Sequence, residues 1–321
     1  MGCSSSVYQG VIMDKRRSSV ATVSSVDALE SNLGHFGSIK KRYGHPSYYK
    51  MDGYDLGLRY KVKGVMQSFF VGCSRQTGEK VTVKEFHLPF YPTDDTSIMT
   101  EVLFLTKLNH AGIPRFLELF ITDTSIFCIT EYVDHQRLSH CMNQLTPTDI
   151  RQIMKQLAAI LTYCHERKIV LRELTPSNIV VKRLGGSNFD VKIADLSLAV
   201  EVHNSTPPAL ADHPLFDWSL VPFCAPELLL SQPYNTSADL WSLGVILFAM
   251  CANGKLPFDH TLDHILIKHI TQAYYDCEDE VWEEVADNAK SLVESLLKLP
   301  ANERLTAKDV TRNHWVVIGA Q

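Results

Sequence analysis

The sequence of 321 residues lacks any apolar run of the ~18 residues that a membrane-spanning helix needs, so we expect no membrane span. Its first residues also lack the apolar stretch of a cleavable secretory signal. The formal net charge is −5, which provides no long-range positive field and predicts no nucleic-acid partner. Because 45% of the residues are hydrophobic, the chain can bury a sizeable core in one large domain or two lobes.

The eight cysteines form no Cys-x-x-Cys pair, and no histidine cluster has the spacing of metal ligands. Several cysteines lie in apolar runs, as Cys128 does in Ile126-Phe127-Cys128-Ile129. This usage is typical of buried, reduced thiols in a cytosolic protein. The sequence contains no EF-hand loop, so we expect no calcium site of that kind.

Residues 1–50 are rich in Ser, Gly, Lys and Arg without sustained periodicity, which predicts a largely disordered tail. Its start, Met1-Gly2-Cys3-Ser4-Ser5-Ser6, fits the pattern for N-myristoylation of Gly2, and Cys3 is placed to take a palmitoyl group. One myristoyl chain binds membranes only marginally, so a second signal is needed from Cys3 or from Lys15-Arg16-Arg17. An accidental Met-Gly start is the alternative. The tail predicts a cytoplasmic protein held at the inner leaflet of a membrane.

The pattern from residue 54 to 133 predicts strands with one helix, and helices dominate after that. Residues 80–86 alternate with period two after a turn at 76–79, residues 98–108 have a helical apolar face, and residues 125–131 form an apolar strand. Thr146 as N-cap, with Pro147 and Asp149 after it, predicts the start of a helix. Residues 237–251 are apolar almost all round, which predicts a buried central helix. Further helices are expected at 288–297 and 307–310.

Seven short motifs follow one another along the chain. They are Val81-Thr82-Val83-Lys84 for V-A-I-K; Glu101, the helix glutamate ahead of Leu108-Asn109-His110; Leu171 to Asn178 for H-R-D-L-K-P-x-N; Ala194-Asp195-Leu196-Ser197 for the D-F-G segment; Ala225-Pro226-Glu227, which is A-P-E unchanged; Asp239 to Gly244 for the central-helix motif; and Arg304, the arginine that pairs with the A-P-E glutamate. One motif alone is weak evidence, but seven in register resemble a protein-kinase domain over most of the chain.

The resemblance implies an α+β, bilobal kinase fold over residues 54–317. The small β-rich N-lobe is expected at about 54–133 and the larger helical C-lobe at about 134–317. The stretch from Leu256 to Val316 is similar to the calmodulin-dependent kinase group. The Met-Gly-Cys start and the ending Trp315-Val316-Val317 are similar to the membrane-anchored protein serine kinase H relatives.

The resemblance also implies a site for ATP and Mg²⁺. Lys84 would hold the α- and β-phosphates, and Glu101 would hold the lysine. Asn178 and Asp195 would ligate Mg²⁺, for which amide and carboxylate oxygens are suitable donors. The further positions carried over for nucleotide binding are Gly64, Thr82, Glu131 and Val133.

Other family positions are changed. Glu173 stands where an aspartate accepts the substrate proton, and Thr175 replaces a lysine near the transferred phosphate. Ser197 replaces the glycine after Asp195, which restricts that turn. Leu220 replaces a threonine before A-P-E, so a hydroxyl is lost. The glycine-rich loop keeps only Gly64 between residues 58 and 71, with Met66 to Phe70 where close backbone approach to the phosphates is needed.

These losses gather where the substrate hydroxyl is oriented and deprotonated, whereas the retained groups serve nucleotide and metal. A pseudokinase that still binds ATP, and acts as a scaffold or allosteric partner, is the simplest interpretation. An atypical Ser/Thr kinase with Glu173 as its base is the alternative. A kinase fold that has lost nucleotide binding is a third interpretation, favoured by the glycine-poor loop.

Overall fold

The computed structural model describes residues 41–43, 50–51, 54–61, 67–74, 76–87, 97–121, 125–202, 210, 217–275 and 280–318. Its described residues divide into two compact units. The N-terminal unit takes those within 1–79, 83–95 and 118–129, and the C-terminal unit takes those within 80–82, 96–117 and 130–321. None of the described helices is both long and apolar enough to cross a bilayer.

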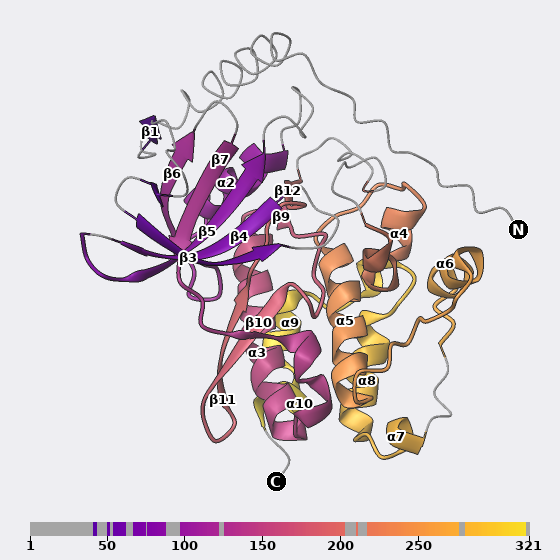
Figure 1. Cartoon of the computed structure of the whole chain (residues 1–321). Coiled ribbons are helices and arrows are strands. Elements are labelled where there is room, and N and C mark those ends of the chain that lie inside the picture. The colour runs from indigo at the N-terminus through magenta and orange to yellow at the C-terminus, as the bar shows by residue number, and fades with distance from the viewer. Residues whose placement is uncertain are drawn as a thin grey trace, which may run out of the picture. The chain divides into compact units, whose positions relative to one another are not determined.

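A seven-stranded sheet is the main element of the first part of the chain, as Figure 1 shows. Its order is β1-β6-β7-β5-β4-β3-β2, with β1 parallel to β6 and β3 antiparallel to both β2 and β4. The strands are β1 Lys41–Tyr43, β2 Lys50–Met51, β3 Tyr54–Lys61, β4 Gln67–Ser74, β5 Lys80–His87, β6 Phe116–Ile121 and β7 Ser125–Glu131.

The turn between β4 and β5 is closed by backbone hydrogen bonds from Gly78 N to Ser74 O and from Ser74 N to Glu79 O. Gly78 has a φ of +72°, a left-handed conformation that glycine adopts without a steric cost. The turn expected at 76–79 is confirmed, because it joins the neighbouring strands β4 and β5, and Val81 is buried on β5. Residues 67–70, expected in the glycine-rich loop, are instead in β4 and pair with β3.

The helical part begins with α2, Ser97–Lys107, which has its apolar residues Val102, Phe104 and Leu105 buried. The longest helix is α3, Pro147–Glu166, where Thr146 and Asp149 form a reciprocal capping box. The remaining helices are α4 Pro226–Leu229, α5 Ser237–Cys251, α6 Asp263–Thr271, α7 Glu280–Glu283, α8 Asp287–Leu296, α9 Ala307–Arg312 and α10 His314–Val317. The four short 3₁₀ segments with described bounds are η2 Leu138–His140, η3 Met142–Gln144, η5 Trp218–Phe223 and η6 Ala301–Glu303.

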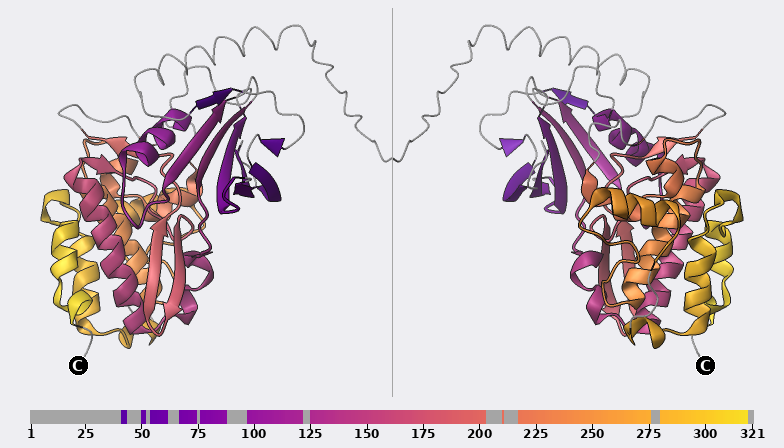
Figure 2. Two further views of the ribbon diagram at one scale, coloured as in Figure 1. Left: turned by 90° about the vertical axis from the view of Figure 1, so that its left-hand side faces the viewer. Right: turned by 90° about the vertical axis from the view of Figure 1, so that its right-hand side faces the viewer.

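The core of this helical part is built around α5, which contacts α3 and α8 (Figures 1 and 2). The helix is buried from Ala238 to Met250, as its nearly continuous apolar sequence predicts. Trp241 is fully buried and stacks on Phe258 with 5.4 Å between ring centroids. The apolar face of α3 packs in this core, and its buried residues are Ile150, Ile153, Met154, Leu157, Ile160, Leu161 and Cys164.

Two small sheets accompany the helices. The hairpin of β10 Ile179–Gly185 and β11 Asn188–Ile193 is antiparallel, and β8 Gln136–Arg137 joins its β10 edge. Strand β9 Ile169–Val170 pairs with β12 Val200–Glu201. These strands carry the segments 171–178 and 194–199 between them, so they hold the ends of the two loops that contain most of the predicted site.

The expected α+β architecture, with a strand-rich first part and a helical second part, is confirmed. The described cysteines form no disulfide with one another: Cys128, Cys141, Cys164 and Cys224 are buried, and Cys73 and Cys251 are partly buried. The predicted tail, residues 1–50, lies outside the described residues apart from 41–43 and 50.

Candidate functional site

The loop of residues 171–178 is anchored to α5 by the buried carboxylate of Asp239. The backbone N–H groups of Leu171 and Arg172 donate to this carboxylate over 2.9 and 3.0 Å. His165, near the end of α3, places its Nε2 atom 2.8 Å from Asp239 Oδ2. Asp239 is fully buried, and these three contacts offset the free-energy cost of burying its charged carboxylate. The position of the loop is therefore set by α3 and α5.

Asn178 and Thr175 close the loop on itself. The N–H of Asn178 donates to Thr175, 3.0 Å from its carbonyl oxygen and 3.2 Å from Oγ1. The Asn178 side-chain amide donates to the carbonyl of Glu173 over 3.0 Å and to the carbonyl of Asp195 over 2.9 Å. Thr175 is buried. The residue in place of the family's lysine thus supports the turn and brings no charge to its surroundings.

Asn178 and Asp195 fit a Mg²⁺ ion. Because Asn178 uses its amide nitrogen as a donor, its Oδ1 is the atom available to a metal. The carboxylate of Asp195 accepts the N–H of Ser197 on Oδ1 over 2.8 Å, and carboxylate oxygens are hard donors of the kind that Mg²⁺ takes. Mg²⁺ usually takes one or two protein ligands and fills its shell with water and phosphate oxygens. Among the described residues, no group of three or more His, Cys, Asp or Glu side chains is arranged to hold a metal ion.

Ser197 links two acidic side chains from distant parts of the chain. Its Oγ atom lies 3.0 Å from Oε2 of Glu101 on α2 and also hydrogen-bonds to Oδ1 of Asp195. Glu101 and Ser197 are both buried. Ser197 is not among the described non-glycine residues with positive φ, so the serine fits this turn without left-handed strain. The sequence predicted a restriction here but did not predict this link.

The remaining predicted nucleotide residues lie on β5 and after β7. Lys84 belongs to the N-terminal unit and is buried, with Nζ 5.1 Å from the centroid of the Phe86 ring. Thr82 and Val133 are partly buried and belong to the C-terminal unit. Gly2, Cys3 and Gly64 lie outside the described residues.

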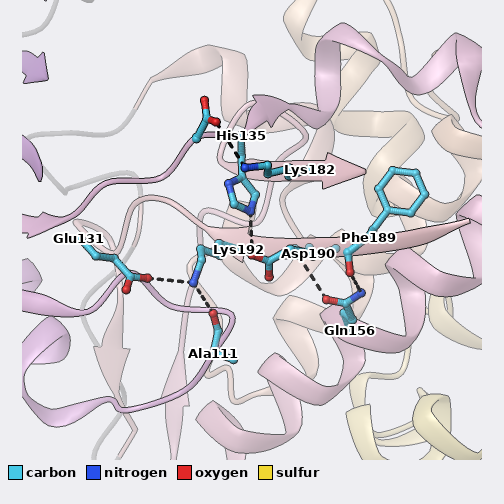
Figure 3. A network of polar contacts seen from close by, with 10 residues as sticks. Ala111, Glu131, His135, Gln156, Lys182, Phe189, Asp190 and Lys192 are labelled. Carbon is cyan, nitrogen blue, oxygen red and sulfur yellow. Dashed lines mark hydrogen bonds and ion pairs between the residues drawn. The ribbon is translucent and has the colours of Figure 1, made fainter. Parts of the chain in front are cut away.

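Glu131 is held by a network of polar contacts that Figure 3 shows. Lys192 on β11 donates to Glu131 Oε1 over 2.9 Å and to the carbonyl of Ala111 over 2.6 Å. The backbone N–H of Glu131 donates to the Arg115 carbonyl over 2.9 Å. The carboxylate of Glu131 therefore stabilises the fold by binding Lys192. Of the polar groups of Glu131, only the main-chain carbonyl would then contact a nucleotide base.

Arg172 connects the loop of residues 171–178 to the segment that follows Ser197. Its Nε donates to the Leu198 carbonyl over 2.6 Å, and one of its terminal nitrogens donates to the Tyr234 hydroxyl over 3.1 Å. Arg172 has a φ of 61°, in the left-handed region that non-glycine residues seldom adopt. The buried guanidinium therefore joins three segments of the C-terminal unit.

The segment before A-P-E is packed by apolar and thiol groups. Leu220, in η5, is buried, and its carbonyl accepts the Cys224 thiol over 3.3 Å. Burial raises the pKa of Cys224 to about 12, and the negative charge of Glu173 adds to this effect. Glu173 therefore lies close enough to Cys224 for its charge to influence the thiol. The neighbouring Leu220 lacks the hydroxyl that the family has at this position.

The ion pair predicted between A-P-E and the distant arginine is present. Arg304 donates to both oxygens of Glu227, over 2.6 and 2.8 Å, in a buried bidentate pair. The family described as "Protein kinase domain" matches residues 63–316 of the chain. The chain belongs to the protein-kinase family. Protein kinases as a family use ATP and Mg²⁺.

Relatives of this kinase domain include serine/threonine-protein kinases of mammals and insects. Mouse serine/threonine-protein kinase 33 is 27% identical over 263 residues, which cover 79% of this chain and 53% of the mouse protein. Human serine/threonine-protein kinase H2 is 26% identical over 81% of this chain and 68% of the human protein. Serine/threonine-protein kinase CG17528 of Drosophila melanogaster is 28% identical over 92% of this chain and 37% of the fly protein. The chain thus matches about half of the mouse protein and less of the fly protein.

Three contributors to the kinase site were missed from the sequence. His165 supports Asp239, Lys192 fixes Glu131, and Ser197 links Glu101 to Asp195. Nothing in the local pattern marks His165 or Lys192, because each acts on a residue more than 60 positions away. Ser197 had a signal, since a hydroxyl in place of glycine beside Asp195 can donate a hydrogen bond to the carboxylate.

Proposed function

We propose that this chain is a membrane-anchored, nucleotide-binding pseudokinase that acts as a signalling scaffold or allosteric partner. The observation that carries this proposal is the structure of the loop 171–178. The hydroxyl oxygen of Thr175 accepts a hydrogen bond from the backbone N–H of Asn178. At the position of Thr175 the family has a lysine, whose positive charge lies near the transferred phosphate.

Two further changes are expected to impair phosphoryl transfer. Glu173 carries its carboxylate one methylene further out than an aspartate, and a displacement of about 1 Å at a reacting centre can cost about 10²-fold in rate. Leu220 offers no hydroxyl to a substrate and is buried. The chemistry most affected is the orientation and deprotonation of the substrate hydroxyl.

The nucleotide side of the site is better preserved. Asn178 and Asp195 keep hard oxygen donors in a fixed relation, because the Asn178 amide donates to the Asp195 carbonyl. Lys84 keeps its place on β5. Bound Mg²⁺ would neutralise phosphate charge, while these side chains position the nucleotide. ATP with Mg²⁺ is the ligand that this set of residues favours.

The alternative function is an active but atypical Ser/Thr kinase, supported by the retained carboxylate of Glu173, a residue whose main-chain carbonyl accepts the Asn178 side-chain amide. In that reaction the substrate hydroxyl gives its proton to Glu173, and its oxygen forms a bond to the γ-phosphorus of ATP. The bond from that phosphorus to the β–γ bridging oxygen breaks, and ADP leaves with the electron pair.

Nucleotide binding is tested by thermal shift with ATP, with and without Mg²⁺. We expect ATP to raise the melting temperature of the wild type and to have no effect on Lys84→Met. Lys182→Met is the matched control, because Lys182 is exposed on β10 and pairs with Asp134. If the wild type shows no shift under either condition, the chain is a kinase fold without nucleotide.

Catalysis is tested by transfer of the labelled γ-phosphate to the protein itself and to generic substrates. The pseudokinase proposal predicts no incorporation above that of Asp195→Ala. Incorporation that is lost in both Glu173→Ala and Asp195→Ala, but kept in the exposed control Glu166→Ala, would establish the alternative and refute the pseudokinase.

Membrane anchoring is tested by fractionation of cells that express the full chain. We expect Gly2→Ala to release the protein into the soluble fraction and Cys3→Ser to weaken its retention, because stable anchoring needs two signals. Ser5→Ala serves as the control within the same segment. Equal membrane retention of Gly2→Ala and wild type would rule out anchoring by myristate.

A further inference from the structure

The hydroxyl of Ser197 occupies a position that the family's glycine leaves empty. It lies between Glu101 Oε2, at 3.0 Å, and Asp195 Oδ1, with which it also hydrogen-bonds. Ser197 and Glu101 are 96 residues apart in the sequence, and both are buried. One side chain thereby joins α2 to the residue that the family uses to bind metal.

The serine adds something that the main chain cannot provide. Any residue at position 197 could donate its backbone N–H to Asp195 Oδ1, as Ser197 does over 2.8 Å. A hydroxyl residue adds one O–H, and Ser197 shares this single proton between the same Asp195 oxygen and Glu101 Oε2. A glycine there would leave the Glu101–Asp195 distance free of this constraint.

The same contacts act on the metal-binding capacity of Asp195. Its Oδ1 atom is engaged by both the N–H and the hydroxyl of Ser197. A metal ion that coordinates this oxygen, or that requires the carboxylate to rotate, has to displace the Ser197 hydroxyl. Hydrogen bonds to charged groups are the stronger ones, so the displacement opposes metal binding.

We propose that Ser197 is a positioning residue that fixes Asp195 to Glu101 without a divalent cation, and so reduces the dependence of nucleotide binding on Mg²⁺. This inference rests on the proposed binding of ATP. It assigns to this chain a nucleotide site in which Asp195 already has a hydrogen bond from the Ser197 hydroxyl before a metal ion binds.

The test measures the affinity for ATP by titration calorimetry, once with excess Mg²⁺ and once with EDTA. The quantity compared is the ratio of the two dissociation constants, which reports the benefit from Mg²⁺. We expect this ratio to be about tenfold larger in Ser197→Ala and Ser197→Gly than in the wild type. Ser197→Thr retains the hydroxyl and should resemble the wild type.

Ser242→Ala is the matched control. Ser242 is also buried, and its hydroxyl donates to the Phe223 carbonyl over 2.7 Å, away from both acidic groups. Its loss should lower stability and leave the Mg²⁺ ratio unchanged. An equal ratio in the wild type, Ser197→Ala and Ser197→Gly would overturn the role of Ser197 alone, whereas the absence of ATP binding with and without Mg²⁺ would overturn the proposed function as well.

A second measurement needs no nucleotide. A double-mutant cycle of Glu101→Gln and Ser197→Ala in urea unfolding isolates the contact between the two side chains. We expect the combined effect on the unfolding equilibrium to depart from the product of the single effects by about threefold or more. Independent effects would mean that Ser197 does not hold Glu101, and the proposal would then fail even if Mg²⁺ ratios differ.

Discussion

The guanidinium of Arg304 donates to both carboxylate oxygens of Glu227 across 77 residues of sequence. The arginine side chain is fully buried, and it also donates to the carbonyls of Lys298 and Ser237 over 2.8 and 3.1 Å. Its guanidinium carbon lies 5.1 Å from the ring centroid of Trp241. One cation thus joins α4, α5 and the segment before α9.

Breaking this pair should destabilise the fold strongly. For Arg304→Met we expect a loss of about 3–5 kcal/mol in the free energy of unfolding, because Glu227 would keep a buried charge without its partner. The surface pair of Lys298 and Glu303, at 3.7 Å and about half exposed, is the control. Lys298→Met should change stability by less than about 1 kcal/mol. Urea unfolding measures both, and similar losses for the two variants would contradict the prediction.

The tight packing of α5 on α8 predicts that Gly244→Ala is destabilising. A β-carbon at Gly244 would lie 2.8 Å from Leu296 Cβ and 2.9 Å from Leu297 Cδ2, closer than packed carbon atoms approach. We expect a loss of about 1–3 kcal/mol, as for other overpacked cores. Ser291→Ala, on the exposed side of α8, should change stability little. An unchanged urea midpoint for Gly244→Ala would show that the two helices separate without cost.

Stability in acid should depend on Asp149. Burial by itself would raise the pKa of this carboxyl, but hydrogen bonds from Arg183 and Thr146 outweigh it and hold the pKa well below 3.8. The ionised carboxylate therefore stabilises the folded state above the usual pKa, and this contribution is lost as the pH falls through the lower pKa of the folded state.

The corresponding experiment follows the free energy of unfolding from neutral pH downward through the acid range. We expect Asp149→Asn to be less stable than the wild type at neutral pH, with a difference that shrinks as the pH falls. Arg183→Met removes the bidentate partner of Asp149. We expect this variant also to be less stable than the wild type at neutral pH, with a difference that shrinks as the pH falls. A difference that is independent of pH would show that Asp149 acts only as a helix cap.

Two buried thiols, Cys164 and Cys224, and the partly buried thiol of Cys251 should be unreactive in the native protein. Burial raises the pKa values of Cys164, Cys224 and Cys251 each to about 12, so little thiolate forms at pH 8. We expect iodoacetamide at that pH to leave all three unlabelled in the folded state and to label them in urea, as resolved by mass spectrometry. Cys73, which is partly exposed, provides an internal comparison. Equal labelling rates in the folded and unfolded states would contradict the assigned burial.

Much of the local structure could be predicted because it depends on neighbouring residues. The capping box of Thr146 and Asp149 fixed the start of α3, and the apolar sequence of 237–251 matched the bounds of α5. The short helix α6 was not predicted, although its buried residues Leu266 and Ile270 lie four positions apart on one face. The start of β4 at Gln67 was also misjudged, since glycine-loop spacing was taken from the family and not from strand pairing.

By itself the sequence determined the family and the α+β class, and it named candidates for the residues of a kinase site, because motifs, periodicity and helix caps are local properties. Only the tertiary structure decided what those residues touch. In the structure, Thr175 hydrogen-bonds to Asn178 and the carboxylate of Glu131 binds Lys192, so both support the fold. The hydroxyl of Ser197 lies between Glu101 and Asp195. Such contacts depend on how helices and loops pack across nearly a hundred residues, and no local pattern encodes that packing.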